Sequence, residues 1–148
     1  MTTSPRPSDA LPYLRAASAG VRHHTRSVRA DTMMVDRVHL DVLHAHLTAL
    51  HQLLDQLAAT TRPPYPAAGR NLAAARTRLW QATAAVHDAF HLLPAATRDA
   101  PAECRPERLP EGPPVLTICQ RHLAAGHITR RTTTPTDLHS PRTTACVR

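Results

Sequence analysis

The sequence predicts an all-α fold, a small helical bundle built on a long antiparallel helical hairpin. Leucines at positions 40, 43, 47, 50, 54 and 57 fall at alternating intervals of three and four residues, the period of one face of an α-helix. We expect this face to pack against a partner helix. A second apolar repeat, with a period of seven, runs from Leu72 to Leu93. Because only a short proline-rich segment (60–69) separates the two repeats, the helices should be antiparallel neighbours.

The composition limits the size and the chemistry of the protein. A chain of 148 residues is expected to form one domain with one core. Its 18 basic residues are all arginine, and its net charge of +7 permits contact with nucleic acid, an anionic surface or an acidic protein. The complete absence of lysine is typical of GC-rich coding, so the arginine content overstates any functional demand for guanidinium groups.

The sequence also predicts where the protein works. It contains no apolar run of the roughly 18 residues that a membrane span needs, and its N-terminus lacks the features of a signal peptide. The three cysteines, Cys104, Cys119 and Cys146, are odd in number and have no close pairing. We therefore expect a reduced, cytoplasmic protein that has no membrane partner.

The N-terminal part of the chain is predicted to be a disordered leader (1–8) followed by an amphipathic helix (9–28) that Gly20 interrupts. Arg22, Arg26 and Arg29 form a basic ridge on this helix. The ordinary role of such a ridge is that of a solvated face, and contact with phosphate groups is the alternative.

The remaining elements follow from the leucine repeats and the prolines. Long helices are predicted at 36–60, capped by Asp31 or Thr32, and at 70–93, where alanines at 75, 82 and 89 form a smooth stripe that would admit another helix. An irregular proline-rich connection (94–114) leads to a short helix (115–126) that should stop at Gly126. The basic tail (132–148) is predicted to be extended or disordered. Residues 9–131 would thus form a single helical domain, in which the first and last helices cover the hairpin.

The expected hairpin fixes which residues lie at the same height, because both helices rise equally per residue. We take Tyr65 as the centre of the loop and place Thr83 and Phe90 on the inward face of the second helix, with Arg76 near the seam. Counting outward then predicts three neighbouring pairs: His44 with His87, His51 with Trp80, and Asp55 with Arg76. Asp55 and Arg76 should form an ion pair, and together with His51 and Trp80 they should form a structural network.

One of these pairs belongs to a candidate metal site. His87 and His91 are four residues apart and share a helical face. With His44 opposite and Asp41 one turn before it, they make a ligand set suited to Zn²⁺. The alternative is a row of half-exposed edge histidines that hydrogen-bond across the seam and bind no cofactor. Histidine is abundant throughout the chain, so its presence on these helices is a weak signal of a metal site. The HExxH motif is absent, and no glutamate lies on a predicted helix, which argues against a carboxylate-bridged di-iron centre.

The segment around Cys119 offers a second, weaker set of metal ligands. Cys119, His122 and His127 have the spacing C-x2-H-x4-H, with Cys104 upstream. We expect Cys119 instead to be a small buried thiol that shares an apolar face with Leu116 and Leu123. No nucleophile elbow, phosphate-binding loop or dinucleotide motif is present, so the sequence does not favour an enzyme.

A third interpretation is DNA binding. The short helix at 115–126, followed by Arg130 and Arg131, has the order of a recognition helix with a basic arm. A helix-turn-helix needs a partner helix a few residues upstream, and here the upstream neighbour is the proline-rich connection. Together with Arg22, Arg26 and Arg29, these arginines would have to lie on one face.

Three segments, LDVLHAHLTALHQLLDQL (40–57), AARTRLWQATAAVHDAFH (74–91) and LTICQRHLAAGH (116–127), resemble an uncharacterised family of short all-helical proteins from high-GC actinobacteria. The resemblance covers roughly residues 36–131. It implies an all-α fold and a cytoplasmic, bacterial setting, and it brings no activity or ligand residues to this chain.

The sequence therefore predicts a non-enzymatic binding or regulatory module that acts through helix faces and a basic surface. A protein partner or self-association is expected, with nucleic acid as the other partner class. Such a module should leave an apolar stripe exposed, either the alanine stripe or the first helix. The metal-binding alternative predicts that the rings of His44, His87 and His91 converge on one point about 2 Å from each.

Overall fold

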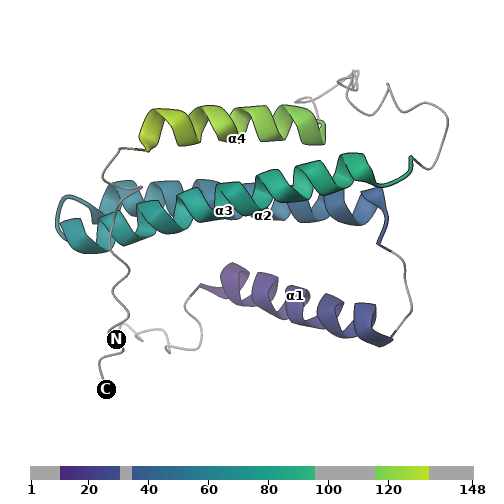
Figure 1. Cartoon of the computed structure of the whole chain (residues 1–148). Coiled ribbons are helices and arrows are strands. Elements are labelled where there is room, and N and C mark those ends of the chain that lie inside the picture. The colour runs from purple at the N-terminus through teal and green to yellow at the C-terminus, as the bar shows by residue number, and fades with distance from the viewer. Residues whose placement is uncertain (1–10, 31–34, 96–115, 134–148) are drawn as a thin grey trace, which may run out of the picture. The chain divides into compact units, whose positions relative to one another are not determined.

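The computed structural model describes residues 11–30, 35–95 and 116–133, and all regular structure in these ranges is α-helical. The helices are α1 (Pro12–Ala30), α2 (Arg37–Thr61), α3 (Pro66–Leu92) and α4 (Ile118–Thr132) (Figure 1). The predicted all-α class is confirmed. The predicted leader (1–8), nearly all of the connection and the tail beyond Thr133 lie outside the described residues. None of the described helices is long and apolar enough to cross a membrane.

The chain divides into two units, Met1–Val35 and Asp36–Arg148, and α1 belongs to the first. Taken by itself, α1 is amphipathic. Leu14, Val21 and Val28 recur every seven residues on one face and are 42%, 51% and 37% exposed. The hydroxyls of Ser18 and Thr25, which lie between them, donate to carbonyls four residues earlier. The expectation that this helix covers the hairpin stays a prediction.

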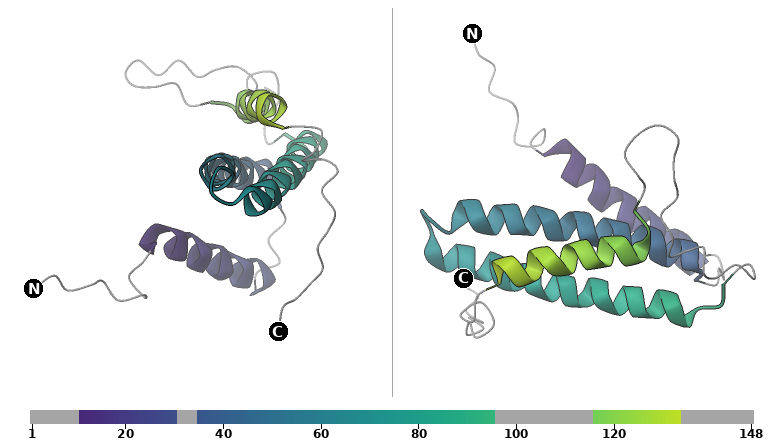
Figure 2. Two further views of the ribbon diagram at one scale, coloured as in Figure 1. Left: turned by 90° about the vertical axis from the view of Figure 1, so that its left-hand side faces the viewer. Right: turned by 90° about the horizontal axis from the view of Figure 1, so that it is seen from above.

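The second unit contains the expected hairpin, with α2 and α3 antiparallel and side by side (Figures 1 and 2). Asp36 is the N-cap of α2, because its carboxylate accepts a 2.8 Å hydrogen bond from the amide of His39. The predicted caps, Asp31 and Thr32, lie outside the described residues. The turn is shorter than predicted, because Pro66 starts α3 at a position where its missing N–H costs nothing.

The most buried face of α2 is turned by about 90° from the leucine repeat. Its members are His44, Thr48, His51 and Ala58, whereas Leu43 and Leu57 stay 43% and 42% exposed. The expectation that the leucines form the packed face is therefore wrong in position. The reason is that α2 contacts both α3 and α4, and its histidine edge is the part that meets both helices.

The inward face of α3 is the predicted one. Thr83, Phe90 and Arg76 are 0%, 5% and 2% exposed. The alanine stripe, in contrast, is not buried within the second unit, because Ala82 is exposed and Ala75 and Ala89 are half-buried. These alanines lie on a different side of α3 from the residues that meet α2.

Helix α4 runs along the hairpin and contacts both of its helices (Figure 2). Thr117 and Gln120 form a reciprocal capping box at its start. The helix continues to Thr132, so the prediction that it stops at Gly126 is wrong. Gly126 is buried inside the helix and faces Trp80, whose ring atoms would lie 3.7 Å from an added Cβ. A methyl group at this position would meet Trp80 at an ordinary van der Waals distance, so packing does not require the glycine, and the glycine does not end the helix.

Polar side chains fill much of the space between α4 and the hairpin. Arg76 donates to Asp55 Oδ1 at 2.6 Å and to Thr133 Oγ1 at 2.9 Å. His51, which is fully buried, lies 2.8 Å through Nε2 from Thr129 Oγ1. Each contact joins residues far apart in the sequence, so together they fix the position of α4 along the hairpin.

The hydrogen bonds of Thr129 also assign the tautomer of His51. The Thr129 hydroxyl donates to the carbonyl of Ala125 at 2.8 Å, so the Nε2–H of His51 must donate to Thr129. Burial lowers the pKa of His51, and the positive charge of Arg76 lowers it further. The folded protein thus holds this ring in its neutral form.

This lowered pKa predicts that acid destabilises the fold. Above the ordinary pKa of 6.5, His51 is neutral in both the folded and the unfolded protein. Below it the unfolded chain takes up a proton first, so the free energy of unfolding falls as the pH falls toward the folded pKa. In His51→Gln, which keeps an N–H donor, the slope should be smaller by up to about 1.4 kcal/mol per pH unit. Urea unfolding between about pH 7 and pH 5, with a metal chelator present, measures it; equal slopes would contradict the assignment.

A second prediction concerns two glycines in helices. A Cβ at Gly69 would lie 2.5 Å from the backbone Cα of Arg62, where the end of α2 passes the start of α3. Gly69→Ala should therefore lower the free energy of unfolding by about 1–3 kcal/mol. The matched control is Gly126→Ala, whose nearest new contacts would be 3.7 Å; it should be neutral or stabilise by up to about 1 kcal/mol. Chemical denaturation of both variants measures this order, and the reverse order would show that the close approach is wrong.

Candidate metal centre

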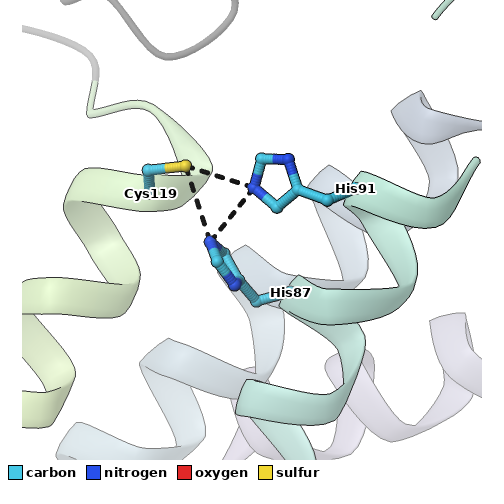
Figure 3. A group of neighbouring side chains, drawn as sticks. All are labelled: His87, His91 and Cys119. Carbon is cyan, nitrogen blue, oxygen red and sulfur yellow. Dashed lines mark hydrogen bonds between the residues drawn. The ribbon is translucent and has the colours of Figure 1, made fainter.

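Three potential metal ligands converge between α3 and α4: His87, His91 and Cys119 (Figure 3). His87 and His91 stand one turn apart near the end of α3, and Cys119 lies in the first turn of α4. Within the described ranges, this is the cluster of three or more His, Cys, Asp or Glu residues whose ligand atoms all lie within 4.8 Å of one another. The arrangement needs α4 in place, because neither helix supplies the whole set.

The distances within the cluster match a tetrahedral zinc site. Cys119 Sγ lies 3.5 Å from His87 Nε2 and 3.3 Å from His91 Nε2, and the two nitrogens are 3.3 Å apart. Zn–S and Zn–N bonds of about 2.3 and 2.0–2.1 Å at tetrahedral angles place sulfur about 3.5 Å from nitrogen and two nitrogens about 3.3 Å apart. The three atoms therefore already hold the spacing that one ion requires.

The ring of His87 has neighbours on both sides. Its Nδ1 lies 3.5 Å from Asp88 Oδ1, and its Nε2 faces Cys119 and His91. The ring stacks on His122 with centroids 4.4 Å apart, and His122 stacks in turn on Trp80 at 6.1 Å. This row of rings crosses from α3 to α4 and back, so it couples the orientation of His87 to the docking of α4.

Cys119 lies in the first turn of α4. It is the second residue of the helix and is not in a disulfide. The prediction that Cys119 is a buried core thiol with Leu116 and Leu123 is wrong. Cys119 is half-buried, and the two leucines are 42% and 60% exposed, because α4 turns Ile118, Ala125 and Thr129 inward.

The other two predicted ligands lie outside this cluster. The carboxylate of Asp41 accepts a hydrogen bond from Arg121 on α4 and forms an ion pair with it. The ring of His44 lies 6.2 Å from that of His87 and 5.9 Å from that of His122. It is fully buried, and neither ring nitrogen has a hydrogen-bond partner among the described residues.

Electrostatics keep the buried rings near the cluster neutral. Burial, followed by the positive charge of Arg121, lowers the pKa of His44 to about 4. Burial and the neighbouring His87 also lower the pKa of His122. Neutral imidazoles behind His87 add no positive charge that would oppose a cation, so the setting is compatible with metal binding.

The remaining candidate residues lie outside the cluster of His87, His91 and Cys119. Asp55 and Arg76 pair across the hairpin, whereas His51 contacts Thr129, and Trp80 stacks on His122. His127 is exposed on α4. Arg130 and Arg131 are in the last turn of α4, and Arg22, Arg26 and Arg29 are on α1 in the other unit. A common face for these five arginines therefore stays a prediction.

The sequence predicted His87 and His91 as metal ligands but did not predict Cys119 as their partner. The short loop of the hairpin gives a register between α2 and α3, whereas a long connection precedes α4 and gives none. The available signal was the i, i+3 spacing of Cys119 and His122, which places both on the side of α4 that meets α3.

Comparison with known proteins agrees with the sequence resemblance. No curated protein and no solved structure matches the chain. Residues 1–147 match a family model described as a family of unknown function, DUF6238. The chain therefore belongs to this uncharacterised family of proteins, and its fold is a small bundle of helices.

Proposed function

We propose that this protein is a non-enzymatic regulatory module that binds one zinc-class metal ion at His87, His91 and Cys119, and that the ion fastens α4 to the hairpin. The observation that carries the proposal is the spacing of the three ligand atoms, at 3.3, 3.3 and 3.5 Å. Three potential ligand atoms at these distances from one another could bind a single cation. A hydrogen-bonded trio of thiol and imidazoles is the competing explanation.

The ligand types favour zinc over other ions. A thiolate and two imidazoles suit a borderline or soft cation, whereas Mg²⁺ and Ca²⁺ prefer oxygen ligands. Electron-transfer copper sites also use two histidines and a cysteine, commonly with an axial methionine. The described ranges contain no methionine. Zinc therefore fits best, with water in the fourth position.

The position of the ligands suggests what the ion does. His91 and Cys119 are 28 residues apart in the sequence, so a shared ion would close a long loop and cross-link two helices. The ion would add to the polar contacts of α4, among them the Arg121–Asp41 pair. In this proposal, metal binding controls how firmly α4 is docked, and the docked helix presents the surface that a partner reads. Contact with DNA through the arginines is the other candidate role, and a steep loss of affinity with added salt would test it.

Metal titration tests the proposal. The full chain without a His tag should bind about one Co²⁺ or Zn²⁺ ion, and the Co²⁺ form should show tetrahedral d–d bands and a thiolate charge-transfer band. His91→Ala and Cys119→Ala should each lose more affinity than the about 10- to 100-fold that an outer-shell substitution costs.

The matched control for this titration is His127→Ala, because His127 is an exposed histidine of α4 outside the cluster. It should bind Co²⁺ with the affinity of the parent protein. Metal binding that survives both ligand substitutions, or a Co²⁺ spectrum without a thiolate band, would show that the ion does not use this cluster.

A further inference from the structure

We propose that Cys119 is an oxidation site for hydroperoxides, and that its oxidation releases the metal ion and loosens α4. This inference rests on the proposed metal binding. It adds a modification site and a chemical class of reactant to the same cluster. The argument depends on the reactivity of the thiol, its exposure, and what remains of the cluster once the sulfur has reacted.

The metal ion of the proposed site would hold the sulfur of Cys119 as a thiolate, because a coordinating thiol loses its proton. The two imidazole nitrogens at 3.3 and 3.5 Å hold the sulfur at the metal position. The thiolate is the form of cysteine that attacks peroxides.

The cluster lies at the surface of the second unit. Cys119 is half-buried and His91 is exposed, whereas His44 and His51 are fully buried. A small oxidant such as hydrogen peroxide can therefore reach the sulfur without unfolding the helices. The oxidant does not reach the buried rings of His44 and His51, so the oxidation should be confined to the exposed edge of the cluster.

The reaction balances with the peroxide as the oxidant. The sulfur of the Cys119 thiolate attacks one peroxide oxygen, an S–O bond forms, and the O–O bond breaks. The sulfur loses two electrons and becomes a sulfenic acid, and the peroxide is reduced to water after taking up one proton for each hydrogen peroxide consumed. A sulfenic acid is a poor metal ligand compared with a thiolate, because the negative charge on sulfur is gone.

Once the sulfur of Cys119 no longer binds the ion, the ion no longer joins α4 to α3. The two ligands that remain, His87 and His91, are both on α3, so an ion bound to them would no longer hold α4. The helix would keep its pair with Asp41 and the contact of Thr129 with His51. Oxidation would thus loosen the first turn of α4, where Cys119 lies, while the contacts of Arg121 and Thr129 still hold the rest of the helix.

The test uses the full chain loaded with zinc, with Cys104→Ser and Cys146→Ser so that Cys119 is the remaining cysteine. The matched variant is Cys119→His, which offers a ligand that forms no sulfenic acid. Hydrogen peroxide is added, released zinc is measured with a chromophoric chelator, and sulfenic acid is trapped with dimedone. Fluorescence of Trp80, the single tryptophan of the chain, reports the docking of α4, because the indole stacks on His122.

The parent should release its zinc ion, form a dimedone adduct at Cys119 and change its Trp80 fluorescence, and a thiol reductant should reverse the change when no trap is present. Cys119→His should keep its zinc. A loaded parent that retains zinc under peroxide, or equal release from both proteins, would overturn this inference alone. A parent that binds no zinc before peroxide is added would overturn the metal function and this inference together.

Discussion

The docking of α4 depends on hydrogen bonds and an ion pair that join its polar side chains to the hairpin. A large apolar contact tolerates sliding, but a buried hydrogen bond is lost when its partners move apart, and an unpaired buried group is costly. Three contacts fix α4 in this way: Thr129 with His51, Thr133 with Arg76, and Arg121 with Asp41. Because they are spread along the helix, α4 has one register on the hairpin.

The convergence of His87, His91 and Cys119 is a consequence of that register. Cys119 reaches His87 and His91 only when α4 stands where its polar contacts place it. The stacked rings of Trp80, His122 and His87 connect the two features, because His122 comes from α4 and the other two rings come from α3. A change in docking would therefore move a ligand and its orienting neighbour together. Metal binding and helix docking should accordingly behave as one coupled equilibrium.

The sequence predicts which residues of two helices are neighbours when the connection between the helices is short. It does not predict them when the connection is long. Counting from Tyr65 placed His44 beside His87 and Asp55 beside Arg76, and the structure has their rings at 6.2 Å and their charged atoms at 2.6 Å. The position of α4 could not be counted, because residues 94–114 set no register. The sequence therefore predicted a partner for the two histidines of α3 on α2, because the short turn fixes the register between these two helices.

The leucine repeat did not predict the most buried face of α2, for a related reason. Its period correctly predicts a helix, but a period identifies a face without saying which neighbour is the most tightly packed. When a helix contacts two others, the side chains between them are the most buried, and in α2 these are His44, Thr48 and His51. Threonine can fill such a face because its hydroxyl bonds to the carbonyl four residues earlier, as Thr48 does to His44 at 2.8 Å.

The most direct test of the metal centre is the location of the ion itself. Crystals of the full chain grown with zinc would be measured on both sides of the zinc absorption edge. The account predicts an anomalous peak about 2.0–2.1 Å from Nε2 of His87 and of His91 and about 2.3 Å from Sγ of Cys119. A well-ordered cluster without a peak, or a zinc ion bound by other residues while these three side chains remain hydrogen-bonded to one another, would contradict it.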